Sequence, residues 1–258
     1  MEVCMLNTAA GKRPRIDFNE KKFIARAALV VFLGIACIVN KDWLINVLEW
    51  AIIWKIRVYH ILWAALMFEL IVAFVPKWNK YICCGKIFKR HYRENEGYDR
   101  EKVRQYTLSS NKAALIVLFV WMAILGIVAY LYFTRVIGKI HVFAITAAAY
   151  LCDTICVNIW CPFRVFIVKN KCCNSCRIYN WGQCMLYSAL ILIPSFWTYS
   201  LLAVALAMLV QWEIQHALYP ERFSEISNLN LRCANCVDKC KTRFRNCEKT
   251  PRAISAGR

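Results

Sequence analysis

Long apolar stretches separated by basic segments restrict this 258-residue chain more than any other feature. A chain of this length cannot bury all of these stretches in one soluble core, so they need lipid around them. The composition agrees, because 60% of the residues are hydrophobic and only 19% are charged. We therefore predict an all-α integral membrane helical bundle with four clear spans. These spans cover about residues 24–39, 58–75, 113–133 and 142–157.

A fifth apolar stretch, residues 184–211, is longer than one crossing and too short for two. Its roughly 28 residues would form a helix of about 42 Å, whereas one crossing of the hydrocarbon core needs about 30 Å. Pro194 lies within the stretch, and proline interrupts the hydrogen-bond ladder of a helix. Two forms therefore stay open. Either the stretch is one long kinked helix, or it bends at Pro194 and returns as a re-entrant hairpin.

The excess of positive charge indicates the orientation in the membrane. The chain has 34 Lys and Arg residues against 16 Asp and Glu residues, and the basic ones lie mainly between the apolar stretches. Basic loops stay on the cytoplasmic side and contact anionic lipid headgroups. Placing both the N-terminus and the C-terminus in the cytoplasm puts most of the basic residues on that side. We therefore predict a multi-pass cell-membrane protein in contact with the lipid bilayer, with no nucleic acid as partner.

The same pattern divides the chain into segments. A Trp-rich amphipathic stretch within the second segment suits a helix lying in the membrane interface. The segments are a basic cytoplasmic tail (1–22), the first two membrane helices (23–75) with the interfacial helix (42–57), a basic cytoplasmic loop (76–112), the third and fourth membrane helices (113–168), a Cys-rich loop (169–183), the re-entrant or fifth helix (184–215) and a Cys-rich basic tail (216–258).

Cysteine is unusually frequent, with 15 residues in the chain. Disulfide frameworks belong to small secreted domains, and an odd number leaves at least one thiol unpaired, so metal binding or redox chemistry is favoured. Two C-x-x-C motifs, Cys173–Cys176 and Cys233–Cys236, each present two thiols from one tight turn. Together they would complete a four-sulfur metal site. The predicted metal ligands are Cys172, Cys173, Cys176, Cys233, Cys236 and Cys240.

The number of thiols bears on the identity of the metal. Four-iron clusters take four thiolates each, so a surplus of cysteines favours one or two iron–sulfur clusters over a single zinc ion. Zinc remains the alternative cofactor, because two C-x-x-C motifs also form a closed tetrahedral zinc site. Redox-active dithiols and cysteines without any ligand are the other two possibilities.

A further group of cysteines lies where the fourth span ends. Cys152 and Cys156 are four residues apart and share a helix face. Next comes Trp160-Cys161-Pro162-Phe163, which resembles the Cys-Trp-x-Cys-Pro-Phe segments of the membrane-bound polyferredoxin-type iron–sulfur proteins of nitrate and nitrous-oxide respiration. In that family the segment lies at the cytoplasmic end of a membrane helix, and electrons pass between quinol and a partner reductase. The resemblance implies that Cys156 and Cys161, with Cys152 beside them, are cofactor-binding residues.

Two acidic residues, Glu69 and Asp153, lie within the second and fourth spans. Burying a charge at membrane depth is unfavourable, so such residues are candidates for proton or charge sites. The alternative is that each is protonated or is paired with a neighbouring polar residue.

Three functions are consistent with these features. The first is electron transfer at the membrane, in which an iron–sulfur centre on the cytoplasmic face exchanges electrons with a quinone or a partner redox protein. The second is a non-catalytic scaffold or assembly factor stabilised by zinc. The third is a membrane thiol–disulfide oxidoreductase. No motif assigns catalytic residues, and the sequence does not decide whether the protein is an enzyme.

Overall fold

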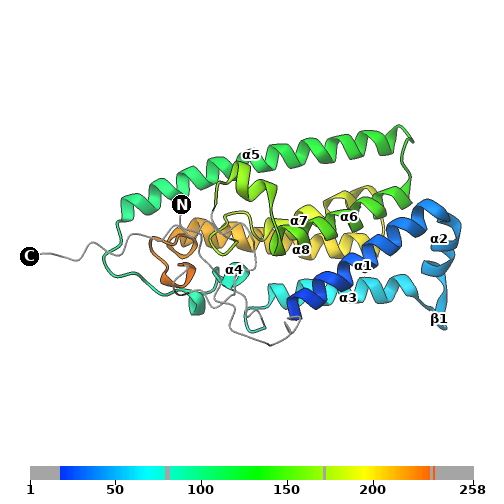
Figure 1. Cartoon of the computed structure of the whole chain (residues 1–258), viewed down its shortest axis with the longest axis horizontal. Helices are drawn as coiled ribbons and strands as arrows, with labels where there is room; N and C mark the ends of the chain where they lie inside the picture. The colour runs from blue at the N-terminus through cyan, green and yellow to red at the C-terminus, as the bar shows by residue number, and fades with distance from the viewer. Residues whose placement is uncertain (1–17, 79–81, 171–172, 233–234, 236–258) are drawn as a thin grey trace, which may run out of the picture.

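The computed structural model describes residues 18–78, 82–170, 173–232 and 235. This part of the chain is mainly helical (Figure 1). Its α-helices are α1 (Phe18–Val39), α2 (Lys41–Glu49), α3 (Val58–Phe74), α4 (Ile82–Gly85), α5 (Arg100–Phe133), α6 (Lys139–Asn158), α7 (Trp181–Ser188) and α8 (Phe196–Leu218). Two short strands, β1 (Ala51–Ile53) and β2 (Ile56–Arg57), form a hairpin. Shorter helical turns are η1 (Lys89–His91), η2 (Phe163–Ile167), η3 (Ala189–Leu192), η4 (Pro220–Phe223) and η5 (Leu229–Leu231).

The long helices run along the long axis of the molecule (Figure 1). Helix α1 packs against α6, α3 packs against α8, and α7 packs against α8. A shared core of apolar side chains from α3, α6, α7, η3 and α8 includes Leu70, Val142, Leu186, Leu201 and Met208, all of them buried. Helix α2 and the hairpin lie at one end of the molecule, and the turns η4 and η5 lie towards the other.

Three helices are long and apolar enough to cross a membrane: α5, α6 as far as Val157, and α8. The apolar parts of α1 and α3, and the segment Trp181–Leu192, are shorter. Large apolar side chains on α5 are exposed on its outer surface, among them Phe119 at 71% and Phe133 at 72%. Because soluble proteins seldom expose such a continuous apolar surface, the helices support the predicted all-α membrane protein.

Residues 184–211 do not form one continuous helix, because the helical path breaks at Pro194. The chain leaves η3 at Leu192, turns through Pro194, and enters α8 at Phe196. Ser195 begins α8 as its N-cap, because its hydroxyl accepts a hydrogen bond from the Thr198 N–H at 3.2 Å. The turn brings α7 and η3 back against α8, so these segments form a helical hairpin.

The segment 42–57, predicted as one interfacial helix, is a helix only as far as Glu49. Trp50 has extended backbone angles, and the hairpin follows it, with Trp54 in the left-handed region at φ 47°. Isoleucines at 52, 53 and 56 favour strand geometry because their branched side chains restrict helical rotamers. The prediction of a helix over the whole segment is therefore wrong for residues 51–57.

Helix α5 begins within the polar segment 76–112, before the third predicted span. The loop's last residues, from Arg100, continue without a break into the third apolar stretch. Asp99 begins the helix, because its carboxylate accepts hydrogen bonds from the N–H groups of Glu101 (2.9 Å) and Lys102 (3.3 Å). A polar first part and an apolar second part thus form one rod of 34 residues.

Candidate functional site: thiols beyond the end of α6

The end of α6 brings two thiols together. After Asn158 the helix stops, and the backbone N–H groups of Ile159 and Trp160 both bond to the Ile155 carbonyl, at 2.7 and 3.0 Å. This tight turn carries Cys161 back towards the last turn of the helix, close enough to Cys156 for each thiol to influence the acidity of the other. We refer to Cys156 and Cys161 as the helix-end pair. Both side chains are partly exposed.

Cys161 lies in surroundings that favour its thiolate. Cys156, the backbone N–H groups of Arg164 and Phe163 and the positive charge of the Arg164 guanidinium all favour its charged form. Together they outweigh the effect of burial and lower the pKa of Cys161 to about 6. The thiolate is the form of cysteine that reacts with disulfides and binds metals.

Arg164 lies among the thiols and is only 5% exposed. Its Nη1 donates to Cys173 Sγ at 3.5 Å, and its charge also acts on Cys161 and Cys176. Its Nε is buried and has no hydrogen-bond partner among the described residues. Because buried polar atoms are nearly always bonded, this N–H group is a donor available to an anion.

The first C-x-x-C motif forms a tight turn next to Arg164. The Cys176 N–H bonds to the Cys173 carbonyl at 3.1 Å, and the Asn170 side chain donates to the Ser175 carbonyl at 2.8 Å. We refer to Cys173 and Cys176 as the loop pair. Cys176 is 4% exposed, and burial raises its pKa, an effect that the charge of Lys86 opposes. The two pairs therefore differ in acidity, with Cys161 the more acidic thiol.

Lys86 stabilises this turn by hydrogen bonds to its backbone. The residue is fully buried, and its ammonium group donates to the carbonyls of Cys176 (2.7 Å) and Asn174 (3.0 Å). It also lies over the rings of Trp212 (4.9 Å) and Phe223 (5.4 Å), which adds cation–π attraction. The lysine thereby ties the loop pair to the end of α8 and to η4.

The chain after α8 packs on the same end of the molecule. Residues 93–95 pair with residues 227–229: the Asn95 N–H bonds to the Ser227 carbonyl at 2.9 Å, and the Leu229 N–H to the Arg93 carbonyl at 2.8 Å. The Asn235 N–H bonds in turn to the Arg232 carbonyl at 3.0 Å. Residues 227–229 are therefore held against the segment 93–95.

The predicted ligands are only partly brought together. Cys156 and Cys161 form the helix-end pair, Cys173 and Cys176 the loop pair, and Cys152 is exposed on α6. In the described ranges, no three His, Cys, Asp or Glu residues are grouped closely enough to hold one metal ion. The other four predicted ligands, Cys172, Cys233, Cys236 and Cys240, lie outside the described residues.

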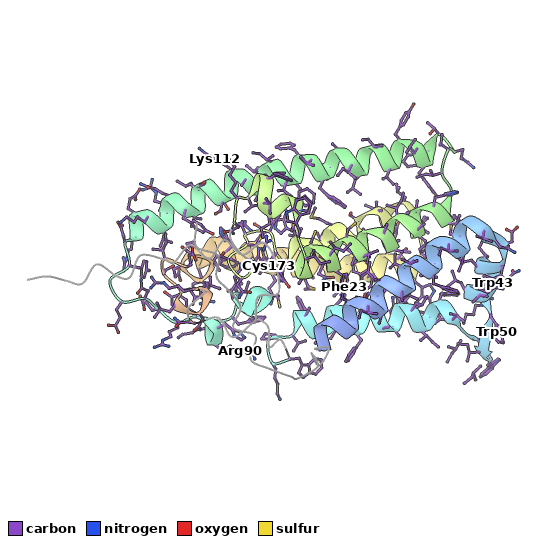
Figure 2. The ribbon with its side chains drawn as sticks, viewed as in Figure 1. Phe23, Trp43, Trp50, Arg90, Lys112 and Cys173 are labelled. Carbon is purple, nitrogen blue, oxygen red and sulfur yellow. The ribbon has the colours of Figure 1, made fainter. Side chains whose placement is uncertain are left out.

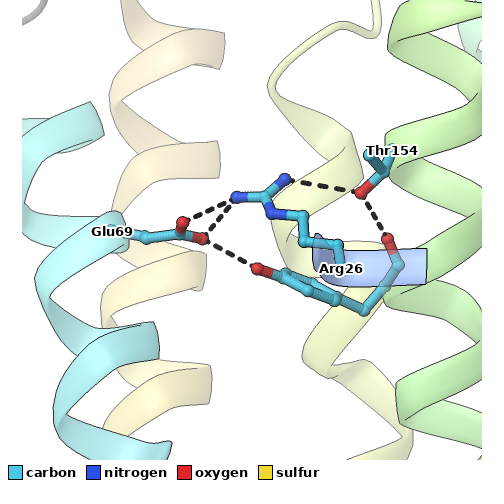
Figure 3. Close-up of polar contacts among 4 residues, drawn as sticks. Arg26, Glu69 and Thr154 are labelled. Carbon is cyan, nitrogen blue, oxygen red and sulfur yellow. Dashed lines mark hydrogen bonds and ion pairs between the residues drawn. The ribbon is translucent and has the colours of Figure 1, made fainter. Parts of the chain in front are cut away.

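Glu69, predicted as a candidate charge site, has a partner within the helical bundle (Figure 3). Both of its oxygens accept from Arg26 Nη2, at 2.7 and 2.6 Å, and the Tyr150 hydroxyl donates to Oε2 at 3.1 Å. Arg26 Nη1 donates to the Thr154 hydroxyl at 3.4 Å. This network links α1, α3 and α6, and it matches the alternative in which the acid is paired with a neighbouring residue.

Asp153, the second predicted charge site, faces α7. A methyl group added at Gly182 would lie 2.6 Å from Asp153 Oδ1, so the glycine allows α6 and α7 to approach closely. The nearest charged groups are Arg26 and Glu69. Asp153 therefore belongs to the same polar region as the Arg26–Glu69 pair.

Sequence reasoning missed the two buried cations that organise the thiols. Arg164 and Lys86 are basic residues in a basic chain, and neither belongs to a motif. One signal was available for Arg164: it is a single charge inside the apolar segment 162–168. An ion pair between the buried Arg177 and the half-exposed Glu213, in which Trp181 also donates to the carboxylate at 2.7 Å, was missed as well.

Comparison with models of protein families, with curated proteins and with solved structures found no match for this chain. The arrangement of the thiols and the two buried cations is therefore the evidence on function.

Proposed function

We propose that this chain is a membrane thiol–disulfide oxidoreductase whose reacting groups are Cys156 and Cys161. The observation that carries the proposal is the turn at the end of α6, which returns Cys161 towards Cys156 and places both thiols close enough to influence each other's acidity, near the Arg164 guanidinium. Two neighbouring thiols can form a disulfide with little movement of the backbone, which is the geometric condition for a dithiol that cycles between two states.

The chemistry follows from the different surroundings of the two thiols. The Cys161 thiolate attacks one sulfur of a partner's disulfide and forms a mixed disulfide, and the partner's other sulfur leaves as a thiolate. Cys156 then attacks Cys161, closes the Cys156–Cys161 disulfide and releases the partner's second sulfur. The Cys156 proton passes to one partner sulfur and a proton from water to the other, so the partner leaves as a dithiol. Each step is reversible.

We also propose an orientation for this chemistry. The segments α1, α3, α5, α6, α7 with η3, and α8 would run alternately in opposite directions, so that both ends of the chain lie on one face. Packing of residues 93–95 against 227–229 supports this arrangement, because it places the α3–α5 connection and the chain after α8 together. The basic residues favour the cytoplasm for that face. The helix-end pair would then meet its partners in a reducing compartment.

The orientation is tested with single cysteines added at exposed positions. Trp54→Cys lies in the hairpin and Lys89→Cys in η1, and both native side chains are exposed. A maleimide that cannot cross membranes should label Trp54→Cys in intact cells above the level of the unchanged chain, and Lys89→Cys only after lysis. Labelling of both variants in intact cells would contradict the arrangement.

The dithiol is tested in redox buffers. The purified protein is equilibrated with glutathione mixtures of increasing oxidation, alkylated, digested and analysed by mass spectrometry. We expect one disulfide joining Cys156 to Cys161, lost in Cys156→Ser and in Cys161→Ser. Cys184→Ser is the matched control, because Cys184 is a partly exposed thiol on α7. The proposal is refuted if both cysteines are still recovered as alkylated free thiols in every redox buffer that is more oxidising than the reduction potential of ordinary protein dithiols.

A metal centre is the second candidate function, and one observation favours it. The loop pair lies on a rigid turn, and the ordered residues before Cys233 pack at the same end of the molecule. Cysteines of the tail would then complete a site with Cys173 and Cys176, holding an iron–sulfur cluster that exchanges electrons with a quinone or partner protein, or a zinc ion that joins loop to tail.

Anaerobic purification followed by metal analysis separates these functions. Iron and sulfide, with broad absorbance at about 400 nm from sulfur-to-iron charge transfer, would indicate a cluster. Stoichiometric zinc without colour would indicate the scaffold. Absence of both metals together with reversible oxidation of Cys156 and Cys161 would indicate the oxidoreductase.

A further inference from the structure

We infer that a hollow between the polar first part of α5 and the turn η4 binds a phospholipid whose headgroup carries several phosphates. The hollow has a volume of about 260 Å³ and is lined by side chains from both elements. No cysteine among the described residues lines it, so the inference is independent of the proposed oxidoreductase function. It adds a binding site and names the chemical class of its ligand.

Two arginines line the hollow on the α5 side. Arg100 and Arg104 are four residues apart, so they lie on the same face of the helix, and both are exposed. Arg104 Nη1 lies 3.5 Å from Glu101 Oε2, an exposed pair of a kind that contributes little. Within the described ranges, no carboxylate lies within ion-pair distance of the Arg100 guanidinium. Both guanidinium groups therefore have N–H donors left for phosphate, which arginine binds through two parallel hydrogen bonds.

Apolar side chains also line the hollow, and they lie towards the membrane. Leu108, which is 52% exposed, is closer than Arg104 to the apolar second part of α5. Figure 2 labels Lys112, which lies at the boundary between the polar and apolar parts of this helix. Pro220 lines the other side and follows the end of α8 by two residues, where that helix leaves the membrane. A ligand in the hollow therefore meets cations at one end and apolar groups at the other, as a phospholipid requires.

Positions along α5 select the kind of headgroup. A helix rises about 1.5 Å per residue, so Arg104 lies about 14 Å and Arg100 about 20 Å before residue 113, where the apolar part begins. The headgroup layer on each side of a bilayer is only about 5–8 Å thick. The phosphate of an ordinary phospholipid would therefore reach the level of Leu108 and stop short of both arginines. A headgroup that carries further phosphates on a sugar ring, as phosphorylated phosphatidylinositol does, extends beyond that layer and meets them.

The hollow is formed before any ligand binds, because contacts behind η4 hold this turn in place. The Ser227 hydroxyl donates to the Glu221 carbonyl at 2.5 Å, and the Asn228 side chain donates to the Arg222 carbonyl at 3.0 Å. Both donors belong to fully buried residues. The turn also packs on α5 and lies at the same end of the molecule as the start of that helix (Figure 1). A ligand that enters a preformed site orders few side chains, which favours binding.

Binding is measured with the purified full chain in an uncharged detergent, by titrating dioctanoyl phosphatidylinositol bisphosphate and following thermophoresis. Arg100→Gln/Arg104→Gln should weaken binding by about tenfold or more, since each basic residue beside an anionic headgroup contributes about a factor of five. The matched control is Lys89→Gln/Lys102→Gln, which removes the same charge from exposed residues that do not line the hollow. It should weaken binding by about threefold or less, because salt screens distant charges. Equal losses in the two double variants would overturn the inference.

An acidic residue of the hollow allows a test in the opposite direction. Glu221 lines the side formed by η4, and its carboxylate opposes the binding of an anion there. Glu221→Gln should therefore bind the same lipid about three to five times more tightly, because a like charge beside the phosphates is removed. Glu96→Gln is the matched control, since Glu96 is exposed and does not line the hollow. A Glu221→Gln variant that gains no more affinity than Glu96→Gln would place the lipid elsewhere and refute the site.

Two further ligands distinguish a lipid from a soluble phosphate. Inositol trisphosphate carries the phosphates without acyl chains, and dioctanoyl phosphatidylserine carries the chains with a single phosphate. We expect both to bind at least about tenfold more weakly than the bisphosphate lipid, because each lacks one of the two kinds of contact. Equal affinity for either ligand would contradict the assigned class. The replaced side chains are exposed or partly exposed, so the melting temperatures of all variants should equal that of the unchanged chain.

Discussion

Replacing Lys86 by methionine is the sharpest test of how the site is held together. Methionine has a similar length and fills the same space without the ammonium group. The native ammonium donates to the carbonyls of Cys176 and Asn174 at 2.7 and 3.0 Å and is fully buried. Lys86→Met removes both of these hydrogen bonds, so the two carbonyl groups lose their shared donor inside the protein.

The expected loss follows from these contacts. Two hydrogen bonds from a charged donor contribute about 1.5–3 kcal/mol each, and cation–π contact with Trp212 and Phe223 adds about 1 kcal/mol or more. Burying the ammonium costs desolvation free energy, which opposes this gain. The methionine variant does not carry that cost. We therefore expect Lys86→Met to reduce the free energy of unfolding by about 2–4 kcal/mol.

Two measurements on the purified protein check this value. The melting temperature should fall by several degrees, and the alkylation rate of Cys176, now 4% exposed, should rise because the turn loosens. Lys89→Met is the matched control: Lys89 lies on the same segment and is exposed, so its loss should change stability by less than about 0.5 kcal/mol. Equal melting temperatures for both variants, with Cys176 still protected, would refute the structural role of Lys86.

Three further predictions concern acidity, the ion pair in the bundle and the hairpin turn. The alkylation rate of Cys161 should rise with pH through about 6 and then level off, because its lowered pKa leaves it a thiolate above that value; Cys156→Ala should move the midpoint upward, and a midpoint near 8.5 in the unchanged protein would contradict the assignment. Arg26→Met should lower the melting temperature more than Arg26→Met/Glu69→Leu does, since the single variant leaves the Glu69 carboxylate without its cation; equal losses would argue against the pair. Ser195→Ala should destabilise the protein by about 1 kcal/mol in thermal unfolding, whereas Ser195→Asp, which also caps, should not.

The helices were largely predictable from the sequence because an apolar run of the right length has few alternatives in lipid. Pro194 likewise indicated the bend before α8, since proline cannot continue the helical ladder. The hairpin at residues 51–57 was not predictable in the same way. A short run of Ile and Trp suits an interfacial helix and an exposed strand equally. The left-handed backbone falls on Trp54 rather than on a glycine, so the sequence carries no signal for this turn.

The cysteines of the site were predictable from the sequence, whereas its buried cations, Lys86 and Arg164, were not. Spacing alone identified Cys173 and Cys176 as one turn, whereas Cys156 and Cys161 were singled out by the resemblance to polyferredoxin-type proteins. The role of Lys86 depends on residues 88 and 90 positions away in the chain, and no local pattern encodes such a contact. The sequence left open whether Glu69 is a charge site, is protonated or is paired with a neighbouring polar residue, and only the packing of α1 against the bundle gives Arg26 as its partner.

The buried cations bear on the choice between a shared metal ion and an exchange of electrons. A four-sulfur metal site needs its sulfurs at about 2.3 Å from one ion. Arg164 contacts Cys173 and acts on Cys161 and Cys176, so a positive charge already occupies the region where an ion bound by these three thiols would lie. Placing a metal cation there would set two positive charges together in a buried region, whereas thiolates formed one at a time would be stabilised. Any metal bound by the loop pair would therefore have to be completed from the tail, on the side of the turn away from Arg164.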